Sequence, residues 1–220
     1  MKHNIDIKGR IVPNDYAWYF DYTGEDYTTP RMVSDVLVQA SAGDEIAVYI
    51  NSPGGSIDAG SEIYSMIREA TADKNVKIYV TGQACSMASV IACAGYCLMA
   101  PTALMMVHCV SSGVIGNHND MEKMAETLRA ADHALVTAYV AKTGKTEEEA
   151  LELMENETWF TAKEAKAIGL VDEIMFDEAL PMVASSGFML PTEEQLKEAR
   201  RAIRQKLIDS VASAHDNVSC

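Results

Sequence analysis

The feature that most constrains the fold is a long stretch without formal charge, from Ile78 to Val107. A bilayer span needs about 20 apolar residues, so the stretch is long enough in principle to cross a membrane. It is interrupted, however, by "TGQ" at 81–83, by two serines, and by "APT" at 100–102. These interruptions favour a strand, a helix, a turn and a further strand buried inside a globular domain, and we expect no membrane association.

The surrounding segments alternate between strand-like and helix-like patterns. Short β-branched runs at 45–51, 76–82 and 103–109 predict strands. Between them lie an amphipathic helix, 57–70, and the apolar segment 86–100, which we interpret as a buried helix. Strands separated by helices of this length are typical of right-handed βαβ units on a largely parallel sheet, so the predicted fold class is α/β.

Further strands and helices are predicted before and after this alternating region. An N-terminal strand or hairpin is predicted from Ile5–Val12 and Ala17–Tyr22, followed by a helix that begins at Thr29 and Pro30. After the third strand come a long helix from Asp120 to about Thr143, an acidic helix in "KTEEEALELMENE", and a helix–glycine–strand finish in "TAKEAKAIGLVDEIM".

The last 40 residues differ from the rest in pattern. Residues 181–187 are small and loop-like, and Thr192 with Gln195 forms a capping-box pattern that begins an appended helix. We therefore divide the chain into a domain of residues 1–180 and a loop with a C-terminal helical tail, 181–220. A helix that binds a partner and a solvated tail are both open readings of this end.

Composition restricts the partners and the location. The net charge of −14, from 32 acidic and 18 basic residues, disfavours nucleic acid and anionic lipid as partners. The N-terminus lacks the apolar core of a signal peptide, and the five cysteines lie mostly in apolar runs as reduced thiols do, so we expect a cytoplasmic protein.

We expect neither a metal nor a cofactor. Cys93 and Cys97 are one helical turn apart, but no second pair or nearby histidine completes a zinc set. The chain contains no phosphate-binding signature of the G-x-x-x-x-G-K-[ST] or G-x-G-x-x-G type.

The predicted strand ends carry the candidate chemistry. Parallel strands place their carboxyl ends at one edge of a sheet, where ligands bind. Ser86 follows the second strand at the start of a helix, where the Met87 N–H is free to donate to an oxyanion. Gly54-Gly55 follows the first strand and allows a second backbone N–H to approach a substrate, and His108 ends the third. Together they supply the parts that acyl transfer needs.

Each part also has an ordinary structural explanation. A Gly-Gly pair often makes only a turn, a serine often caps a helix, and a histidine often satisfies a core position. Cys85 is a second candidate nucleophile, because a helix start can lower the pKa of a thiol. Alanines flank Ser86 where the G-x-S-x-G elbow has glycines, which argues against an α/β-hydrolase.

Four ordered motifs resemble the Clp protease proteolytic subunit and its relatives among the phage head-maturation proteases. They are "YINSPGGSIDAGSEIYSMI", "VTGQACSMASVIACAG", "ALMMVHCVSSG" and "ETWFTAKEAKAIGLVDEI". The resemblance runs from about Ile5 to Asp177 and implies a serine endopeptidase with the spiral of βαβ units that the family shares with the crotonases. It also implies a long handle helix, beginning near Asp120, that builds homo-oligomeric rings.

The resemblance assigns roles residue by residue. It implies Ser86 rather than Cys85 as nucleophile, His108 as general base, and the backbone N–H groups of Gly55 and Met87 as oxyanion donors. Glu157 stands where the family has its aspartate triad acid. Substrate-binding positions are Gly54 and the segment Ser111, Ser112 and Gly113, whose small residues would pair with an extended peptide.

The finer function follows from departures within this resemblance. The N-terminal 5–30 stretch and the "NETW" variant look more like the phage and prophage type, which trims capsid or scaffold proteins. Only four residues precede Ile5, where the Clp subunit has a segment that helps dock an ATPase, so an ATPase partner stays open. The alternatives are an ATP-dependent Clp-type subunit, a crotonase-type acyl-CoA enzyme, and a scaffold whose triad has drifted.

Overall fold

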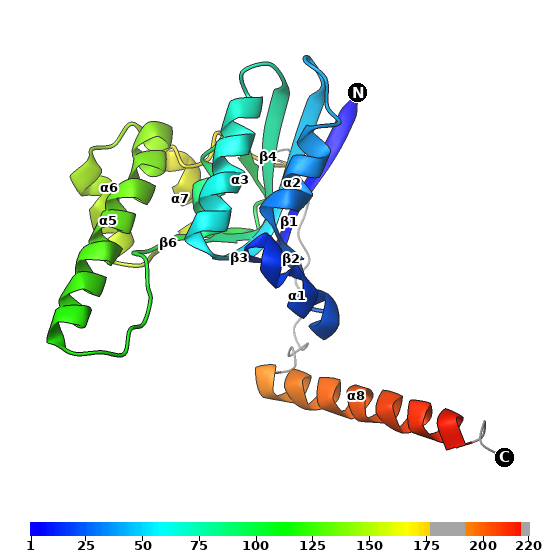
Figure 1. Cartoon of the computed structure of the whole chain (residues 1–220). Coiled ribbons are helices and arrows are strands. Elements are labelled where there is room, and N and C mark those ends of the chain that lie inside the picture. The colour runs from blue at the N-terminus through cyan, green and yellow to red at the C-terminus, as the bar shows by residue number, and fades with distance from the viewer. Residues whose placement is uncertain (177–191, 217–220) are drawn as a thin grey trace. The chain divides into compact units, whose positions relative to one another are not determined.

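The computed structural model of the chain describes residues 1–176 and 192–216, with side chains as far as Gln205 (Figure 1). The chain divides into two compact units, Met1–Glu178 and Ala179–Cys220. The loop predicted at 181–187 lies outside the described residues.

One mixed sheet organises the first unit. Its eight strands within the described residues are β1 (Lys2–Ile11), β2 (Tyr27–Thr28), β3 (Glu45–Gly55), β4 (Asn75–Cys85), β5 (Tyr96–Met99), β6 (Leu104–Val107), β7 (Thr158–Thr161) and β8 (Glu173–Ile174). The order is β2-β1-β3-β4-β5-β8, and β6 pairs with both β4 and β7. Every pairing is parallel except β6 with β7, so the predicted α/β class with a largely parallel sheet is confirmed.

The helices begin and end at residues whose chemistry explains them. They are η1 (Asn14–Tyr16), α1 (Ala17–Thr23), α2 (Pro30–Leu37), α3 (Ile57–Ala70), α4 (Met87–Ala92), α5 (His118–Thr143), α6 (Glu147–Glu155) and α7 (Ala162–Ala167). The predicted cap of α2 is confirmed, since the Thr29 side chain accepts a hydrogen bond from the Met32 N–H. Capping boxes begin α5, α6 and α7.

The core lies between the sheet and its helices and includes all of α4 and the buried faces of α5, α6 and α7, while α2 and α3 lie side by side over one face of the sheet (Figure 1). Ile63 and Ile67 of α3 are fully buried, as the amphipathic pattern predicts. Val48 and Ile50 of β3 are equally buried, whereas Tyr49, which points to the other face, is partly exposed and stacks on Tyr79 with ring centroids 5.2 Å apart.

Two local predictions are wrong. The stretch 17–22 is not the second strand of a hairpin but the helix α1, bounded by Pro13 and by Gly24, which closes it with a φ of 69°. The apolar segment 86–100 is not one helix, because α4 ends at Ala92 and β5 begins at Tyr96 after Gly95. Periodicity does not distinguish a buried strand from a buried helix in such a short apolar run.

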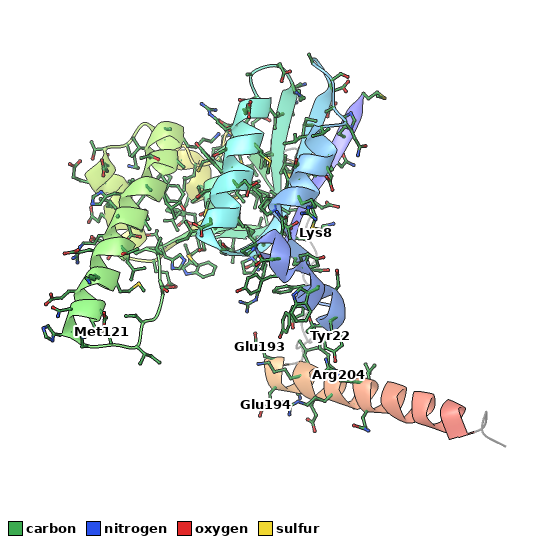
Figure 2. The ribbon with its side chains drawn as sticks, in the orientation of Figure 1. Lys8, Tyr22, Met121, Glu193, Glu194 and Arg204 are labelled. Atoms are coloured by element: carbon green, nitrogen blue, oxygen red, sulfur yellow. The ribbon has the colours of Figure 1, made fainter. Side chains whose placement is uncertain are left out.

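The long helix α5 is buried only near its C-terminal end, at Val136, Ala138 and Tyr139. Its first turns project away from the sheet, where Met121 is exposed (Figure 2). None of the helices described, α5 included, is long and apolar enough to cross a membrane.

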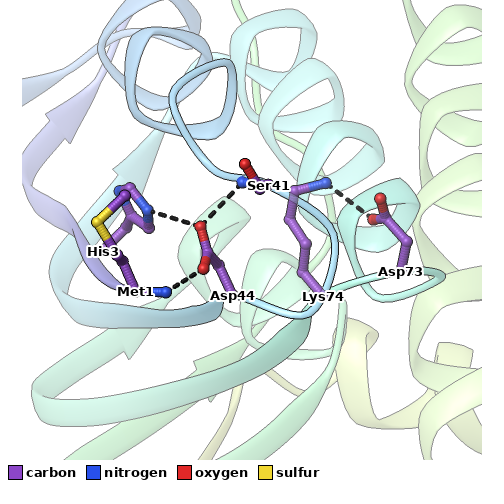
Figure 3. Close-up of polar contacts among 6 residues, drawn as sticks. All are labelled: Met1, His3, Ser41, Asp44, Asp73 and Lys74. Carbon is purple, nitrogen blue, oxygen red and sulfur yellow. Dashed lines mark hydrogen bonds and ion pairs between the residues drawn. The ribbon is translucent and has the colours of Figure 1, made fainter.

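Two further features complete the described chain. The start of β1 is joined to the segment before β3 by the Asp44 carboxylate, which accepts hydrogen bonds from the Met1 amine, His3 and the Ser41 N–H (Figure 3). In the second unit, α8 spans Glu193–Asp216, and Thr192 exchanges hydrogen bonds with Gln195 as the capping-box pattern predicts.

Candidate active site

Three neighbouring strands end at the candidate site. β4 lies between β3 and β6, and all three run in parallel, so their carboxyl ends share one edge of the sheet. Gly54 and Gly55 end β3, Ser86 follows β4 directly, and His108 follows β6. The structure therefore brings together these residues that the sequence pattern singled out separately.

Ser86 and His108 are in hydrogen-bond contact. The His108 Nε2 atom lies 2.8 Å from the Ser86 Oγ atom. Ser86 occupies a sharp turn between β4 and α4 with a φ of 56°, a left-handed conformation that is uncommon for a residue with a side chain. Its N–H donates to the Met106 carbonyl of β6 at 2.9 Å, so the strand that carries His108 also holds the turn that carries the hydroxyl.

The Gly54 backbone packs closely against this turn. A Cβ atom at Gly54, whose φ is 93°, would lie 2.7 Å from both the Cys85 carbonyl oxygen and the Ser86 Cβ. At Gly55, with a φ of 153°, a Cβ would lie 2.1 Å from the Ile11 carbonyl oxygen of β1. Both positions therefore require glycine, and the requirement comes from close backbone approach at the site rather than from a turn.

The second predicted oxyanion donor begins a helix. Met87 is the first residue of α4, and the N–H groups of the first turn of a helix have no acceptor within that helix. The positive end of the helix dipole also lies here, although α4 is short. A developing negative charge beside Ser86 would meet this N–H group.

A small pocket of about 80 Å³ opens beside the Ser86 and His108 side chains. Its lining includes Gly55, Met87 and Ser111, together with the apolar side chains of Ile57, Val90, Val110, Leu135 and Tyr139. Neither aspartate nor glutamate lines it among the described residues. The pocket has both polar and apolar surface, and it lacks the carboxylates that a crotonase-type reaction centre would place there.

Cys85 differs from its neighbour Ser86 in environment. The Cys85 side chain is 3% exposed, and this burial raises the pKa of the thiol above its ordinary value. A buried thiol with a raised pKa is a poor nucleophile at neutral pH, which favours Ser86 over Cys85.

Glu157 lies near His108 along the backbone but does not contact it through its side chain. The antiparallel register of β6 and β7 pairs Val107 with Thr158, and one further step would place Glu157 opposite His108. The exposed Glu157 carboxylate instead accepts a hydrogen bond from the Trp159 indole N–H at 3.4 Å. Within the described part of the chain, no hydrogen bond joins Glu157 to His108.

The predicted peptide-binding segment is irregular and open to solvent. Residues 108–116 form no strand, and Ser111, Ser112 and Gly113 are exposed. Ser111 lines the pocket, and a Cβ atom at Gly113 would meet no atom within 4 Å.

Sequence reasoning missed three supporting residues. The Asp132 carboxylate of α5 accepts the Val110 N–H at 2.6 Å and so fixes the segment that follows His108. Ser89, which is fully buried, contacts the Ser86 carbonyl oxygen and the Tyr139 hydroxyl. No signal in the sequence marked the contacts of Asp132 and Tyr139, because both depend on where α5 packs.

The two cysteines weighed as metal ligands lie in the core. Burial raises the pKa of the Cys93 and Cys97 thiols, that of Cys97 to about 12. Across the described residues, no three or more histidine, cysteine or acidic side chains converge as metal ligands would.

Comparison with known proteins adds independent observations. The model of the Clp protease family matches residues 23–178. The ATP-dependent Clp protease proteolytic subunit of Bacteroides fragilis is 33% identical over 176 residues, covering 78% of this chain and 84% of that protein. Proteolytic subunit 1 of Chlamydia abortus is 37% identical over 145 residues (64% and 74%), and that of Streptomyces avermitilis 35% over 159 residues (70% and 72%).

Proposed function

The chain belongs to the Clp protease family, whose members are serine endopeptidases, and on this premise we propose that Ser86 and His108 carry out peptide-bond hydrolysis. The observation that carries the proposal is the 2.8 Å contact between the Ser86 Oγ and His108 Nε2 atoms. This distance is within the reach that proton transfer between nucleophile and base requires.

The reaction follows from this geometry. The Ser86 Oγ attacks the peptide carbonyl carbon while His108 Nε2 takes its proton, and the carbonyl oxygen becomes an oxyanion that accepts hydrogen bonds from the Gly55 and Met87 N–H groups. The C–N bond then breaks, His108 returns the proton to the leaving amine, and an acyl-enzyme remains on Ser86. Water, deprotonated by His108, releases the acid product and restores the serine hydroxyl.

Glu157 is our candidate for the group that orients the His108 ring. The strand register supports this role, because continuing the β6–β7 pairing by one residue beyond Val107 and Thr158 would set Glu157 opposite His108. A change of the Glu157 rotamer, away from Trp159, would let the carboxylate accept the ring N–H at Nδ1 and hold the tautomer that leaves Nε2 free as the base.

An extended peptide would bind along the open backbone around the pocket. Ser111, Ser112 and Gly113 are small and exposed, whereas Gly54, the other predicted substrate-binding position, is buried against the Ser86 turn and would act only by leaving room for the substrate. Backbone pairing of this kind binds the substrate through its main-chain groups rather than through its side chains. The pocket beside Ser86 and His108 then receives one substrate side chain next to the scissile bond.

The substrates that we propose are the capsid or scaffold proteins of phage head maturation. Support comes from the N-terminal stretch, which contains the aromatic helix α1 and lies mostly before residue 23, where the family match begins. The second candidate is a cytoplasmic, ATP-dependent Clp-type subunit, favoured by the names of the relatives from Bacteroides fragilis and Chlamydia abortus. Family members form oligomeric rings that act on protein substrates, and we expect this chain to do so.

Hydrolysis of casein and of purified phage scaffold protein tests the proposal. Light scattering first isolates the ring-sized assembly, and the wild type is compared with Ser86→Ala and Glu157→Gln. We expect Ser86→Ala to abolish cleavage and Glu157→Gln to lower it by about 100-fold or more without changing assembly. Equal cleavage by the wild type and Ser86→Ala would refute the proposal. A ring that cleaves neither protein but cleaves short peptides would favour the ATP-dependent subunit, and one that cleaves no peptide either would favour the drifted scaffold.

A further inference from the structure

A buried chain of hydroxyl groups connects α5 to the turn that carries Ser86. The Ser89 Oγ atom lies 2.6 Å from the Ser86 carbonyl oxygen and 2.8 Å from the Tyr139 hydroxyl. Ser89 is 0% exposed and Tyr139 5% exposed, so neither group exchanges its partner for water. The contact spans 50 residues of sequence and is therefore a product of the fold.

The direction of these hydrogen bonds follows from the number of protons. The Ser86 carbonyl oxygen only accepts, so the single Ser89 hydroxyl proton points at it. The Tyr139 hydroxyl must then donate its own proton to the Ser89 Oγ. Burial raises the pKa of Tyr139, which keeps this donor protonated at neutral pH.

The anchored carbonyl oxygen belongs to the same peptide unit as the Met87 N–H. That unit is planar and trans, so its C=O and N–H bonds point in opposite directions. Fixing the carbonyl oxygen toward Ser89 therefore fixes the direction of the N–H away from it. The same carbonyl also accepts from the Ser89 N–H at 2.9 Å and from the Val90 N–H at 3.4 Å, and the Ser89 hydroxyl, at 2.6 Å, is the third and shortest constraint on the plane of this peptide.

We propose that Ser89 and Tyr139 are positioning residues that aim the Met87 N–H at the oxyanion, with Tyr139 acting only through Ser89. The proposal rests on the proposed function, in which Met87 supplies an oxyanion donor. Tyr139 also lines the pocket beside Ser86, so its ring contacts the site while its hydroxyl supports the turn. Neither residue touches the reacting atoms.

The test compares Ser89→Ala, Tyr139→Phe and the double variant in the ring-sized assembly. The readouts are kcat and KM for a peptidyl-leucyl aminocoumarin, and the affinity for a peptide leucinal, whose adduct with Ser86 carries an oxyanion. We expect Ser89→Ala to lower kcat and leucinal affinity by about tenfold with little change in KM, because a donor is misdirected rather than deleted. Tyr139→Phe should lower both by about threefold, because Ser89 still donates.

The double variant gives the sharpest result. If Tyr139 acts through Ser89, the double variant should match Ser89→Ala in kcat, whereas independent effects would multiply. Matched controls lie on α3: Ser65→Ala removes an exposed helix serine that donates to the Ser61 carbonyl at 2.8 Å, and Tyr64→Phe removes a phenol away from the site. Neither control should change kcat.

The outcomes separate this inference from the proposed function. If Ser86→Ala abolishes turnover but the variants keep wild-type kcat and leucinal affinity, the positioning role is wrong and the peptidase stands. If turnover does not depend on Ser86, the proposed function itself fails. Should Ser89→Ala fail to fold, Tyr139→Phe, which keeps the ring and its packing, decides the question alone.

Discussion

Among single residues, the left-handed backbone of Ser86 and the glycine that faces it place the hydroxyl that we propose as the nucleophile. A residue with a side chain adopts such a conformation only where its surroundings hold it. Here the holding groups are the Met106 carbonyl, which accepts the Ser86 N–H, and Ser89, which anchors the Ser86 carbonyl. Both bonds hold backbone atoms of Ser86, the second through the Ser89 side-chain hydroxyl, so the position of the Ser86 hydroxyl depends on the turn more than on the rotamer.

Gly54→Ala tests this dependence against a matched glycine. Gly43 has a φ of 83°, close to the 93° of Gly54, but a Cβ there would meet no atom within 4 Å. Both substitutions place alanine in a left-handed conformation, which costs about 1–2 kcal/mol. Only Gly54→Ala also pushes on the Ser86 turn, so we expect its kcat to fall by about 100-fold while Gly43→Ala keeps wild-type kcat. Urea unfolding and peptide turnover measure the two effects, and equal kcat in both variants would contradict the account.

At the scale of elements, α5 supports the site although its residues do not react. Its buried end supplies Tyr139 to the pocket, and Asp132, two turns earlier, holds the Val110 N–H of the segment after His108. Burial of the Cys109 thiol is the main cause that raises its pKa to about 11, and the negative charge of the Asp132 carboxylate is the second. The segment between β6 and α5 is thus fixed at its beginning and open farther on.

Asp132→Ala should loosen the segment that carries His108. We expect kcat for peptide hydrolysis to fall by about tenfold, because the segment beside His108 is no longer held in place. In Asp132→Asn, which keeps an acceptor oxygen, kcat should fall less. Glu126→Ala, an exposed change on the same helix, serves as the control and should leave kcat unaltered. Steady-state kinetics on the assembled protein decide, and wild-type kcat in Asp132→Ala would rule out this supporting role.

Some helices and strands could be predicted from the sequence, and others could not. The α3 helix, its buried face and the strand ends were predictable, because periodicity and glycine punctuation are local signals. The placement of α5 against Ser89 and Val110 was not, because it is a long-range packing result. The α1 segment was misread because aromatic residues suit strands as well as a short helix, and only Phe20 of α1 is buried.

In the candidate site, too, the residues set by local signals were predictable, and the side-chain orientation set by packing was not. Ser86 and His108 could be predicted because each directly follows a strand, and neighbouring parallel strands bring such positions together. The triad acid could not be placed, because the orientation of the Glu157 side chain depends on Trp159 and on the local backbone, whose φ of 45° at Glu157 is itself unusual.

In the molecule as a whole, the first strand is held to the sheet by strand pairing and also by hydrogen bonds to the charged Asp44 carboxylate. The Met1 amine, the Ser41 N–H and His3 all contact the Asp44 carboxylate, and these hydrogen bonds, the one from the amine foremost, lower the pKa of Asp44 to about 2 (Figure 3). A lowered pKa in the folded state means that the unfolded chain takes up the proton first as the pH falls.

The stability that Asp44 contributes should therefore be complete above about pH 4 and lost as the pH falls toward 2. We expect Asp44→Asn to have a smaller free energy of unfolding than the wild type at pH 5 and a flatter dependence on pH between 4 and 2. Asp73→Asn, which removes an exposed partner of Lys74, should keep the wild-type slope. Urea unfolding at pH 5, 4, 3 and 2 provides the measurement, and parallel pH profiles for Asp44→Asn and the wild type would contradict the role of Asp44.

Covalent labelling shows whether Ser86, activated by His108, is the nucleophile of a serine peptidase. The ring-sized protein is treated with a fluorophosphonate, and the modified residue is located by mass spectrometry. We expect one adduct on Ser86 that disappears in Ser86→Ala, forms much more slowly in His108→Ala and persists in Cys85→Ala. A properly assembled protein that takes up no label, or takes it up on another residue, would contradict this expectation.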